Sequence, residues 1–211
     1  MERAKCGIVG AIHEYLTVTQ LTTIWRRHDF PGHEACRVIR IDSRWQIAGV
    51  AVFVCENKPC RLNYEIDCDP HWVTRSAVVT GWVGEQTIDI AILRDANGQW
   101  QHNGRVCDAV AGCIDIDLNF SPSTNLLPIR RLNLNVGAAA QVRAAWLKFP
   151  SFTLEPLEQS YTRLDQMFYR HESAGGRFVA DLSVDSAGMV INYGEIWSRE
   201  EAAKSQHDKM N

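Results

Sequence analysis

Asp115 and Asp117 lie one residue apart in the alternating run CIDIDLNF (113–120). If this run is a β-strand, both side chains point to the same face, with their Cα atoms about 6.5–7 Å apart. Two carboxylates at that separation could serve as the acid and the nucleophile or base of a glycoside hydrolase. An Asp-x-Asp pair on a strand is more often a solvated face or one side of an ion-pair ladder, so the spacing leaves both interpretations open.

Two adjacent arginines, Arg130 and Arg131, follow shortly afterwards. We expect residues 113–120 and 129–136 to form a β-hairpin, in the register that pairs apolar side chains with apolar side chains. That register places Arg131 beside the two aspartates. Both carboxylates would then stay ionised, which disfavours either of them as a general acid.

The same register leaves Arg130 on the apolar face of the hairpin. Its guanidinium could extend past the strand end into solvent. Alternatively it could lie in a cavity, where a buried charge needs a counterpart such as the phosphate or carboxylate group of a ligand. Arg130 is therefore a candidate ligand-binding residue.

Polar side chains fill the connection between the two expected strands, SPSTN (121–125). These hydroxyl and amide groups could cap a well-ordered turn through hydrogen bonds to the backbone. They could also form a polar lip that hydrogen-bonds the head group of a ligand. The candidate ligand-binding residues of the sequence are Ser121, Ser123, Thr124, Asn125, Asp117, Arg130 and Arg131.

In the rest of the chain, which must position the candidate ligand-binding residues, apolar and polar side chains mostly alternate with a period of two residues. Runs such as WQIAGVAVFV (45–54) and RFVADLSV (177–184) are rich in β-branched and aromatic residues, as strands are. Such runs begin about 8–12 residues apart and are separated by turn signals, a spacing typical of a sandwich or barrel. Only TLEPLEQSY (153–161) and the polar tail 199–211 are expected to be helical or irregular.

We therefore predict an all-β protein with little helix. Residues 1–198 form a single antiparallel β domain, barrel-like or a closed sandwich, and residues 199–211 form a polar C-terminal tail. A weak internal similarity suggests two duplicated halves, about 22–85 and 143–198. In each half a tryptophan next to a basic residue (IWRR, AWLK) precedes an arginine-led strand (RLNYEIDCD, RFVADLSVD).

Charge argues against nucleic acid as a partner, and hydropathy argues against a membrane-spanning helix. The net charge is −3 and the basic residues are dispersed, so the sequence has no electrostatic footprint for nucleic acid. No apolar run approaches the ~20 residues of a membrane helix, and no transmembrane segment is expected. The apolar stretch Cys6–Ile12 is short and contains two glycines, unlike a secretion signal, which favours a cytoplasmic protein.

The seven cysteines cannot all pair within one chain, so reduced thiols are expected. Cys55, Cys60, Cys68 and His71 could be read as zinc ligands, but a continuous strand would hold Cys60 and Cys68 roughly 26 Å apart. Zinc ligands lie ~2.0–2.3 Å from the metal, so no metal site is expected. The sequence contains no Gly-rich phosphate loop, G-x-S-x-G elbow or H-E-x-x-H motif, and we expect no cofactor.

Four segments together resemble one known family. They are WRRHDFPGHEACRV (25–38), GCIDIDLNFSPSTNLLPIRRL (112–132), VGAAAQVRAAWLKFPSFTLEPLEQSYTRLD (136–165) and DLSVDSAGMVINYGEIW (181–197). The chain resembles the bacterial putative glycolipid-binding family, formerly a domain of unknown function, over about residues 22–197. The resemblance implies a β-rich, barrel-like domain with duplicated halves and a glycolipid ligand. It supplies no catalytic residues.

The binding interpretation is favoured over an enzyme. An apolar cavity would hold a small amphiphile, a glycolipid or fatty-acyl compound, and each buried methylene would contribute ~0.8 kcal/mol. The polar mouth of this cavity would come from the SPSTN segment and Arg130, with charge-assisted hydrogen bonds selecting the head group.

Two alternatives remain open. The chain could be a hydrolase that acts on a glycosylated or phosphorylated small molecule through Asp115 and Asp117. It could also be a scaffold that pairs with a partner through an exposed sheet edge or through Arg199–Asn211. The sequence does not indicate the oligomeric state.

Overall fold

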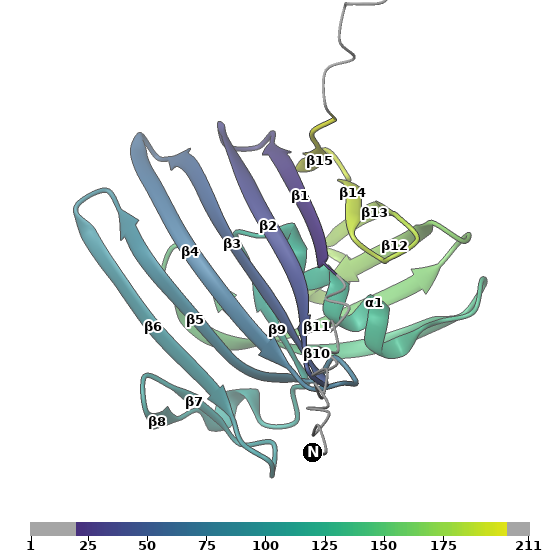
Figure 1. Ribbon diagram of the computed structural model, residues 1–211, viewed down its shortest axis with the longest axis horizontal. Coiled ribbons are helices and arrows are strands. Elements are labelled where there is room, and N and C mark those ends of the chain that lie inside the picture. Colours follow the sequence, from purple (N-terminus) through teal and green to yellow (C-terminus); the bar gives the residue numbers. More distant parts are fainter. Residues whose placement is uncertain (1–19, 202–211) are drawn as a thin grey trace, which may run out of the picture.

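Alternating apolar and polar side chains form strands over most of residues 20–201, the part of the chain that the computed structural model describes (Figure 1). Fifteen strands join into one sheet. The sheet curls without closing on itself, because its two ends are the short strands β8 and β9, which do not pair with each other. The prediction of an all-β, barrel-like protein with little helix is confirmed, although the barrel stays open.

The first eight strands form an antiparallel meander in which each strand pairs with the next. Strand β4 shows the alternation that produces this meander. Leu62, Tyr64 and Ile66 are buried, while their neighbours Arg61 and Glu65 are exposed. The strands are β1 (Gln20–Arg27), β2 (Gly32–Ile41), β3 (Arg44–Cys55), β4 (Lys58–Cys68), β5 (Thr74–Val83), β6 (Gln86–Arg94), β7 (Trp100–His102) and β8 (Arg105–Val106).

The last six strands form a second antiparallel meander. Strands β1 and β15 pair with each other over three residue pairs, from Trp25–Arg199 to Arg27–Trp197, and so join the two meanders. The strands are β10 (Ala139–Lys148), β11 (Thr153–Arg163), β12 (Phe168–Ser173), β13 (Phe178–Val184), β14 (Val190–Tyr193) and β15 (Trp197–Arg199), with a 3-10 turn η3 (Ala174–Gly176) after β12.

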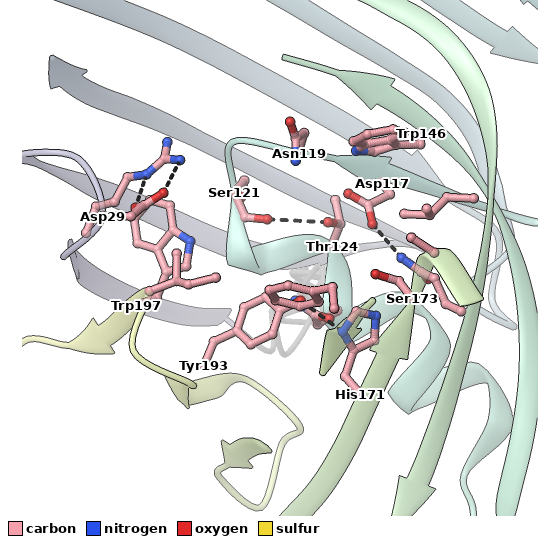
Figure 2. A pocket seen from close by; sticks show the side chains of 17 residues that line it. Asp29, Asp117, Asn119, Ser121, Thr124, Trp146, His171, Ser173, Tyr193 and Trp197 are labelled. Atoms are coloured by element: carbon pink, nitrogen blue, oxygen red, sulfur yellow. Dashed lines mark hydrogen bonds and ion pairs between the residues drawn. The ribbon is translucent and has the colours of Figure 1, made fainter. Parts of the chain in front are cut away.

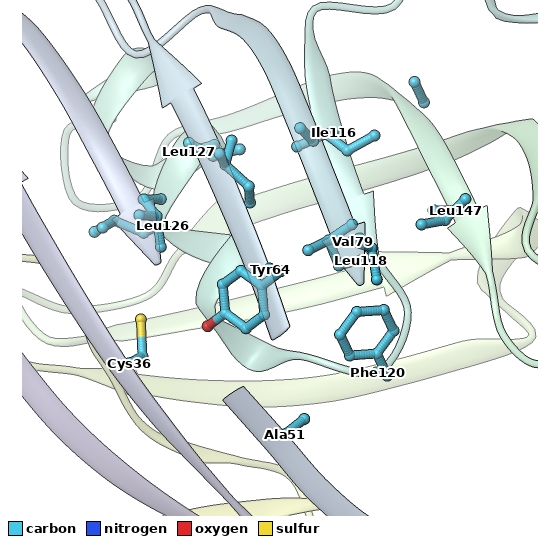
Figure 3. Packing of buried hydrophobic residues seen from close by; sticks show 14 of the residues in the cluster. Cys36, Ala51, Tyr64, Val79, Ile116, Leu118, Phe120, Leu126, Leu127 and Leu147 are labelled. Carbon is cyan, nitrogen blue, oxygen red and sulfur yellow. The ribbon is translucent and has the colours of Figure 1, made fainter. Parts of the chain in front are cut away.

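The segment between the two meanders, residues 113–132, packs against the inner face of the sheet, and we call it the plug. It follows a 3-10 turn η1 (Asp108–Val110) and contains β9 (Asp115–Leu118), the 3-10 helix η2 (Pro122–Asn125) and the helix α1 (Leu126–Leu132). Its largest apolar side chains are almost fully buried in the common core, as Figure 3 shows for Phe120 against Tyr64. These plug side chains are Ile116, Leu118, Phe120, Leu126 and Leu127.

The hairpin predicted for residues 113–120 and 129–136 is wrong. Strand β9 pairs with β10, in parallel, and the stretch after it folds into α1. Leu126, Leu127 and Ile129 are buried on this helix, and Pro128 lies in its first turn, where a missing N–H interrupts no hydrogen bond. Asn133 then ends the helix in the left-handed conformation.

The helical or irregular structure expected for residues 153–161 is also wrong, because they belong to β11. Pro156 lies in the first half of this strand. Strand β12 pairs only with Gln159–Arg163, so the first half of β11 has one unpaired edge. A proline is tolerated at such an edge.

The two predicted halves correspond in position to the two meanders, and their duplication stays a prediction. Arg199, where the predicted tail begins, is the last residue of β15. Residues 1–19 and 202–211 lie outside the described residues, and with them the stretch Cys6–Ile12.

Candidate ligand-binding cavity

A cavity of about 310 Å³ lies between the plug and the second meander. Asp29 and Trp197 lie at one end of it, Asp117 and Ser173 lie at the other, and Ser121 and Thr124 lie between them (Figure 2). Aromatic side chains make up much of its wall. They are Trp146, Phe178, Tyr193 and Trp197.

Strand β9 carries Asp117 into the cavity, because the opposite face of this strand, Ile116 and Leu118, is buried in the core. Nε2 of Gln159 donates to Oδ2 of Asp117 at 2.6 Å, and Oδ1 has no hydrogen-bond partner among the described residues. Burial raises the pKa of Asp117 to about 6, against the opposing effect of the Gln159 hydrogen bond. At neutral pH this end of the cavity therefore holds a carboxylate with one oxygen free to accept from a ligand.

His171 on β12 is the second polar group of this end. Its Nδ1 lies 3.0 Å from the hydroxyl of Tyr193, and its Nε2 is buried without a partner within residues 20–201. Burial lowers the pKa of His171 to about 4, so the ring is neutral at physiological pH. A neutral imidazole with an unpaired nitrogen can exchange a hydrogen bond with a ligand hydroxyl.

Arg27 occupies the opposite end of the cavity. Its Nε and Nη2 donate to the two carboxylate oxygens of Asp29 at 2.7 and 3.0 Å. The guanidinium also lies over the rings of Phe30, Phe53 and Trp197, at 4.5, 4.7 and 5.2 Å from their centroids. Nη1 is buried without a partner among the described residues. Asp29 neutralises the charge of Arg27. This end of the cavity therefore holds an ion pair that is surrounded by aromatic side chains.

Ser121 connects the cavity wall to a buried acid. Its hydroxyl donates to Oε1 of Glu34 at 2.6 Å, and the hydroxyl of Tyr64 donates to the same oxygen at 2.5 Å. Burial raises the pKa of Glu34 to about 8, although both hydrogen bonds and the charge of Arg27 oppose the rise. Glu34 is therefore largely protonated at neutral pH, and it fixes the orientation of Ser121.

Four of the predicted ligand-binding residues line the cavity, namely Asp117, Ser121, Thr124 and Asn125. Ser123 lies behind the wall, where its backbone N–H donates to the Ser121 hydroxyl and its own hydroxyl lies 2.7 Å from it. The SPSTN segment therefore fits both interpretations of the sequence. It is a turn capped by Ser121, and it forms a polar edge of a cavity.

Arg131 and Asp115 form an ion pair outside this cavity. Nε and Nη2 of Arg131 donate to the two Asp115 oxygens at 2.9 and 2.5 Å. The expected carboxylate neighbour of Arg131 is present, although it is reached from helix α1 and not from a strand. Because both oxygens of Asp115 are bound to Arg131, the geometry does not support Asp115 and Asp117 as an acid and base acting on one ligand.

Arg130 does not line this cavity, and of the two placements that the sequence allowed, its guanidinium takes the solvent-exposed one. It is exposed near the C-terminus of α1, and its Cζ lies 5.5 Å from the ring centroid of Trp72. The register argument that placed Arg130 on an apolar strand face does not apply, because α1 replaces that strand.

Sequence patterns alone did not identify several residues of the cavity. Gln159, His171, Tyr193 and Arg27 come from four different strands and meet only in the folded chain. For Gln159 a signal existed, since Leu157, Gln159 and Tyr161 share one parity, but the segment was interpreted as non-strand. The other three had no local signal.

Residues 20–201 contain no group of three or more His, Cys, Asp or Glu side chains arranged to hold a metal ion. Cys60 and Cys68 both lie in β4, as the zinc argument assumed. None of the helices in the described range has the length and hydropathy of a membrane span.

Fold and cavity together define an all-β protein whose single curled sheet encloses a small polar and aromatic cavity. The chain belongs to the family described as "Putative glycolipid-binding", whose model matches residues 22–199. The resemblance drawn from the sequence is thereby confirmed.

The chain is similar to the crystal structure of a DUF1089 family protein from Pseudomonas aeruginosa. The two are 30% identical with a TM-score of 0.72, and the match covers 95% of this chain and 100% of that one. No curated protein matches the chain.

Proposed function

We propose that this protein binds the sugar head group of a glycolipid, without covalent chemistry, in the cavity between the plug and the second meander. The family description supports the ligand class. The observation that carries the proposal is the composition of the cavity, in which aromatic walls surround a few fixed hydrogen-bonding groups. A sugar ring needs both, because its C–H faces are apolar while its hydroxyls donate and accept at the rim.

The aromatic side chains and the polar groups take different parts of the ligand. Trp146 and Tyr193 present rings to the cavity, on which a sugar face can stack. Oδ1 of Asp117 and Nε2 of His171 are two of the lining groups without a partner among the described residues; the carboxylate oxygen accepts from ligand hydroxyls, and the imidazole nitrogen accepts from or donates to them.

The side-chain amides of Asn125 and Gln159, which also line the cavity, are held in place by hydrogen bonds within the protein. Asn125 accepts from the Tyr161 hydroxyl at 2.8 Å and donates to the carbonyl of Pro122 at 3.1 Å. Gln159 is held by Asp117. A preorganised site loses less conformational entropy on binding, which favours a rigid ligand such as a sugar ring.

The acyl chains of the glycolipid lie outside this cavity. Its volume of about 310 Å³ is at the lower end of ordinary small-molecule pockets, enough for a head group. The apolar interior that the sequence suggested for an acyl chain is occupied by plug side chains such as Phe120, Leu126 and Leu127. We therefore place recognition in the head group.

Isothermal titration with octyl glycosides tests the proposal. The panel carries glucose, galactose, mannose or N-acetylglucosamine, and 1-octanol is the sugar-free control. At least one glycoside should bind and 1-octanol should not. Asp117→Asn should weaken binding about ten- to a hundredfold, the effect of losing a hydrogen bond to a charged acceptor. The matched control Asp89→Asn, on the exposed face of β6, should leave the affinity unchanged.

Two results would contradict the proposal. One is equal binding of 1-octanol and every glycoside, which would indicate a lipid-chain site. The other is no binding of any glycoside by a protein with a cooperative unfolding transition.

A pH series adds an independent check on the role of Asp117. Its pKa of about 6 means that the carboxylate becomes protonated as the pH falls through that value, and it then loses an acceptor for a ligand hydroxyl. Glycoside affinity should therefore fall below about pH 6 in the wild type. In Asp117→Asn the affinity should not change over the same range, because the amide does not titrate.

A further inference from the structure

Two turns on the far side of α1 from the cavity lie side by side. They are residues 133–138, between α1 and β10, and residues 164–167, between β11 and β12 (Figure 1, right edge). The backbone N–H of Gly137 donates to the carbonyl of Arg163 at 2.7 Å, and that of Arg163 donates to Ala138 at 2.9 Å. Nη1 of Arg163 also donates to the carbonyl of Leu134 at 2.7 Å. These bonds hold the two turns together as one unit.

Large hydrophobic side chains on this unit are exposed. Val136, Leu164, Met167 and Phe168 have between 40 and 54% of their surface in solvent. They are four of the twelve large hydrophobic residues that are exposed within residues 20–201, although three come from the two short turns and Phe168 directly follows the second turn. We call these four side chains the apolar tip. Such a concentration on one protruding edge indicates an interaction surface.

Basic side chains border the apolar tip. A groove of about 570 Å³ is lined by Met167 of the tip and by Arg130, Arg163, Asn133 and Gln166. Arg130 is exposed and has neither an ion pair nor a side-chain hydrogen bond to another described residue. The guanidinium of Arg163 donates only to backbone carbonyls and pairs with no carboxylate of the described residues.

Asp185 also lines this groove, and Asp165 lies in the turn next to it. Asp185 is paired with Arg199 at 2.8 Å and is thereby neutralised. Asp165, in the turn between β11 and β12, has no ion pair among the described residues and offsets one of the arginines. The border of the apolar tip is therefore weakly cationic, with Arg130 as its unpaired charge.

We propose that the apolar tip docks on the surface of an anionic lipid bilayer. Hydrophobic side chains of this size partition into the boundary between head groups and acyl chains, and neighbouring arginines contact lipid phosphates. Charge complementarity selects the bilayer as the partner, since an exposed apolar edge with an unpaired arginine matches an apolar layer beneath negative phosphates.

The tip is a separate site from the cavity and does not depend on the function proposed for it. Phe168 begins β12, while His171 and Ser173, which line the cavity, lie near its other end. Five residues of extended strand separate Phe168 from Ser173 by roughly 17 Å. Membrane docking and sugar binding can therefore succeed or fail independently.

Vesicle co-sedimentation tests the docking surface. Vesicles of phosphatidylcholine alone are compared with equimolar phosphatidylcholine and phosphatidylglycerol. The wild type should sediment with the anionic vesicles, and added salt should weaken the association by screening the arginines. The double variant Met167→Ser/Phe168→Ser should lose at least tenfold in binding to the anionic vesicles.

Two further variants separate the apolar and the electrostatic contributions. Val52→Ser/Val179→Ser, at positions that are 51 and 52% exposed on other parts of the sheet, is the matched control and should bind as the wild type does. Arg130→Gln should reduce binding to anionic vesicles several-fold and leave the weak binding to phosphatidylcholine unchanged.

A fluorescence measurement keeps the proposal testable if the double variant does not fold. Phe168→Trp should be quenched by vesicles of brominated phosphatidylglycerol, and Val179→Trp should not. Failure of the wild type to bind either vesicle would overturn the proposal, as would equal quenching of the two tryptophans. A dimer in solution that Met167→Ser/Phe168→Ser dissociates would also overturn it, because the tip would then be an interface between two copies of the chain.

Discussion

Glu34 is a carboxylic acid fully enclosed by protein, with Tyr64 and Ser121 donating to one of its oxygens. Its other oxygen, Oε2, has no partner among the described residues. Burial raises its pKa from 4.5 to about 8. Between these two values the unfolded chain has lost the proton while the folded protein keeps it, so the free energy of unfolding falls as the pH rises.

Glu34→Gln should remove this loss, because glutamine has the shape of the protonated acid and does not titrate. Below pH 4.5 the variant and the wild type should be about equally stable, and above about pH 8 the variant should be more stable by several kcal/mol. Urea unfolding over this pH range measures the difference. The exposed Glu65→Gln on β4 is the control and should follow the wild type. A constant difference at all pH values would show that folding does not shift the pKa of Glu34.

The two neighbouring arginines of α1 should behave differently on substitution. Asp115 is 1% exposed, and Arg131 is bound to both of its oxygens. Arg131→Met should lower the free energy of unfolding by about 3 kcal/mol or more, because it leaves a buried carboxylate unpaired. Arg130→Met, at an exposed position, should change it by less than about 0.5 kcal/mol.

A double variant checks the reason for that difference. Asp115→Asn in the Arg131→Met background removes the buried charge and should recover part of the stability, as urea unfolding would report. If the two losses simply add, the ion pair is not the cause, and the packing of the Arg131 side chain stabilises α1 instead.

At the scale of elements, α1 depends on how it ends. Asn133 has φ 43° and ψ 51°, and its N–H donates to the carbonyl of Ile129 at 3.2 Å. Asn133→Gly should leave the melting temperature unchanged or raise it. Asn133→Val should lower the free energy of unfolding by about 1–2 kcal/mol, because a β-branched residue fits this conformation poorly. Asn135→Val, also exposed but without a positive φ, is the control; an equal loss there would contradict the argument.

The same helix shows where sequence reasoning stops. Strands β3 and β4 could be predicted because each has a long alternating pattern, which fits a strand and does not fit a helix. In LLPIRRLNLNV the alternation of the last six residues indicates a strand, while Leu126, Leu127 and Ile129 also fit one face of a helix. Packing against the inner face of the sheet decides in favour of the helix, and no local pattern contains that contact.

The candidate site divides in the same way. Asp117, Ser121, Thr124 and Asn125 could be predicted because they are close in sequence and form one polar stretch. Arg27 and His171 lie far from them along the chain. Arg27 reaches the cavity because β1 pairs with β15, and His171 because β12 is linked to β9 through β11 and β10. Such long-range pairings are set by the topology of the whole sheet.

At the scale of the whole molecule, the two meanders carry the same cross-strand pair near their first turns. Trp25 faces Glu34 between β1 and β2, and Trp146 faces Glu155 between β10 and β11. The first pair is buried, with Glu34 bound to Ser121 of the plug, and the second borders the cavity through Trp146. This equivalence supports the predicted duplication of 22–85 and 143–198. The plug makes the two meanders differ. Its side chains fill the space beside the first meander, whereas a cavity remains between the plug and the second meander.

The plug should also make the two meanders unfold together. The seam between β1 and β15 covers only three residue pairs, but the plug bonds to both halves, through Ser121 to Glu34 and through Asn125 to Tyr161. Leu127→Ala, at a fully buried plug position, should therefore lower the stability of both halves equally, by about 3 kcal/mol. Hydrogen exchange followed by mass spectrometry measures this, peptide by peptide.

In that experiment, Leu127→Ala should reduce protection equally in the two meanders. The amides to compare are the slowest-exchanging ones of β3 and β4 and of β12 and β13. Val179→Ala, half-exposed on the outer face of β13, should leave both sets unchanged. Loss of protection confined to one meander would contradict the argument. It would mean that the seam and the plug contacts are too weak to couple the halves, and that the cavity lies between two units that open separately.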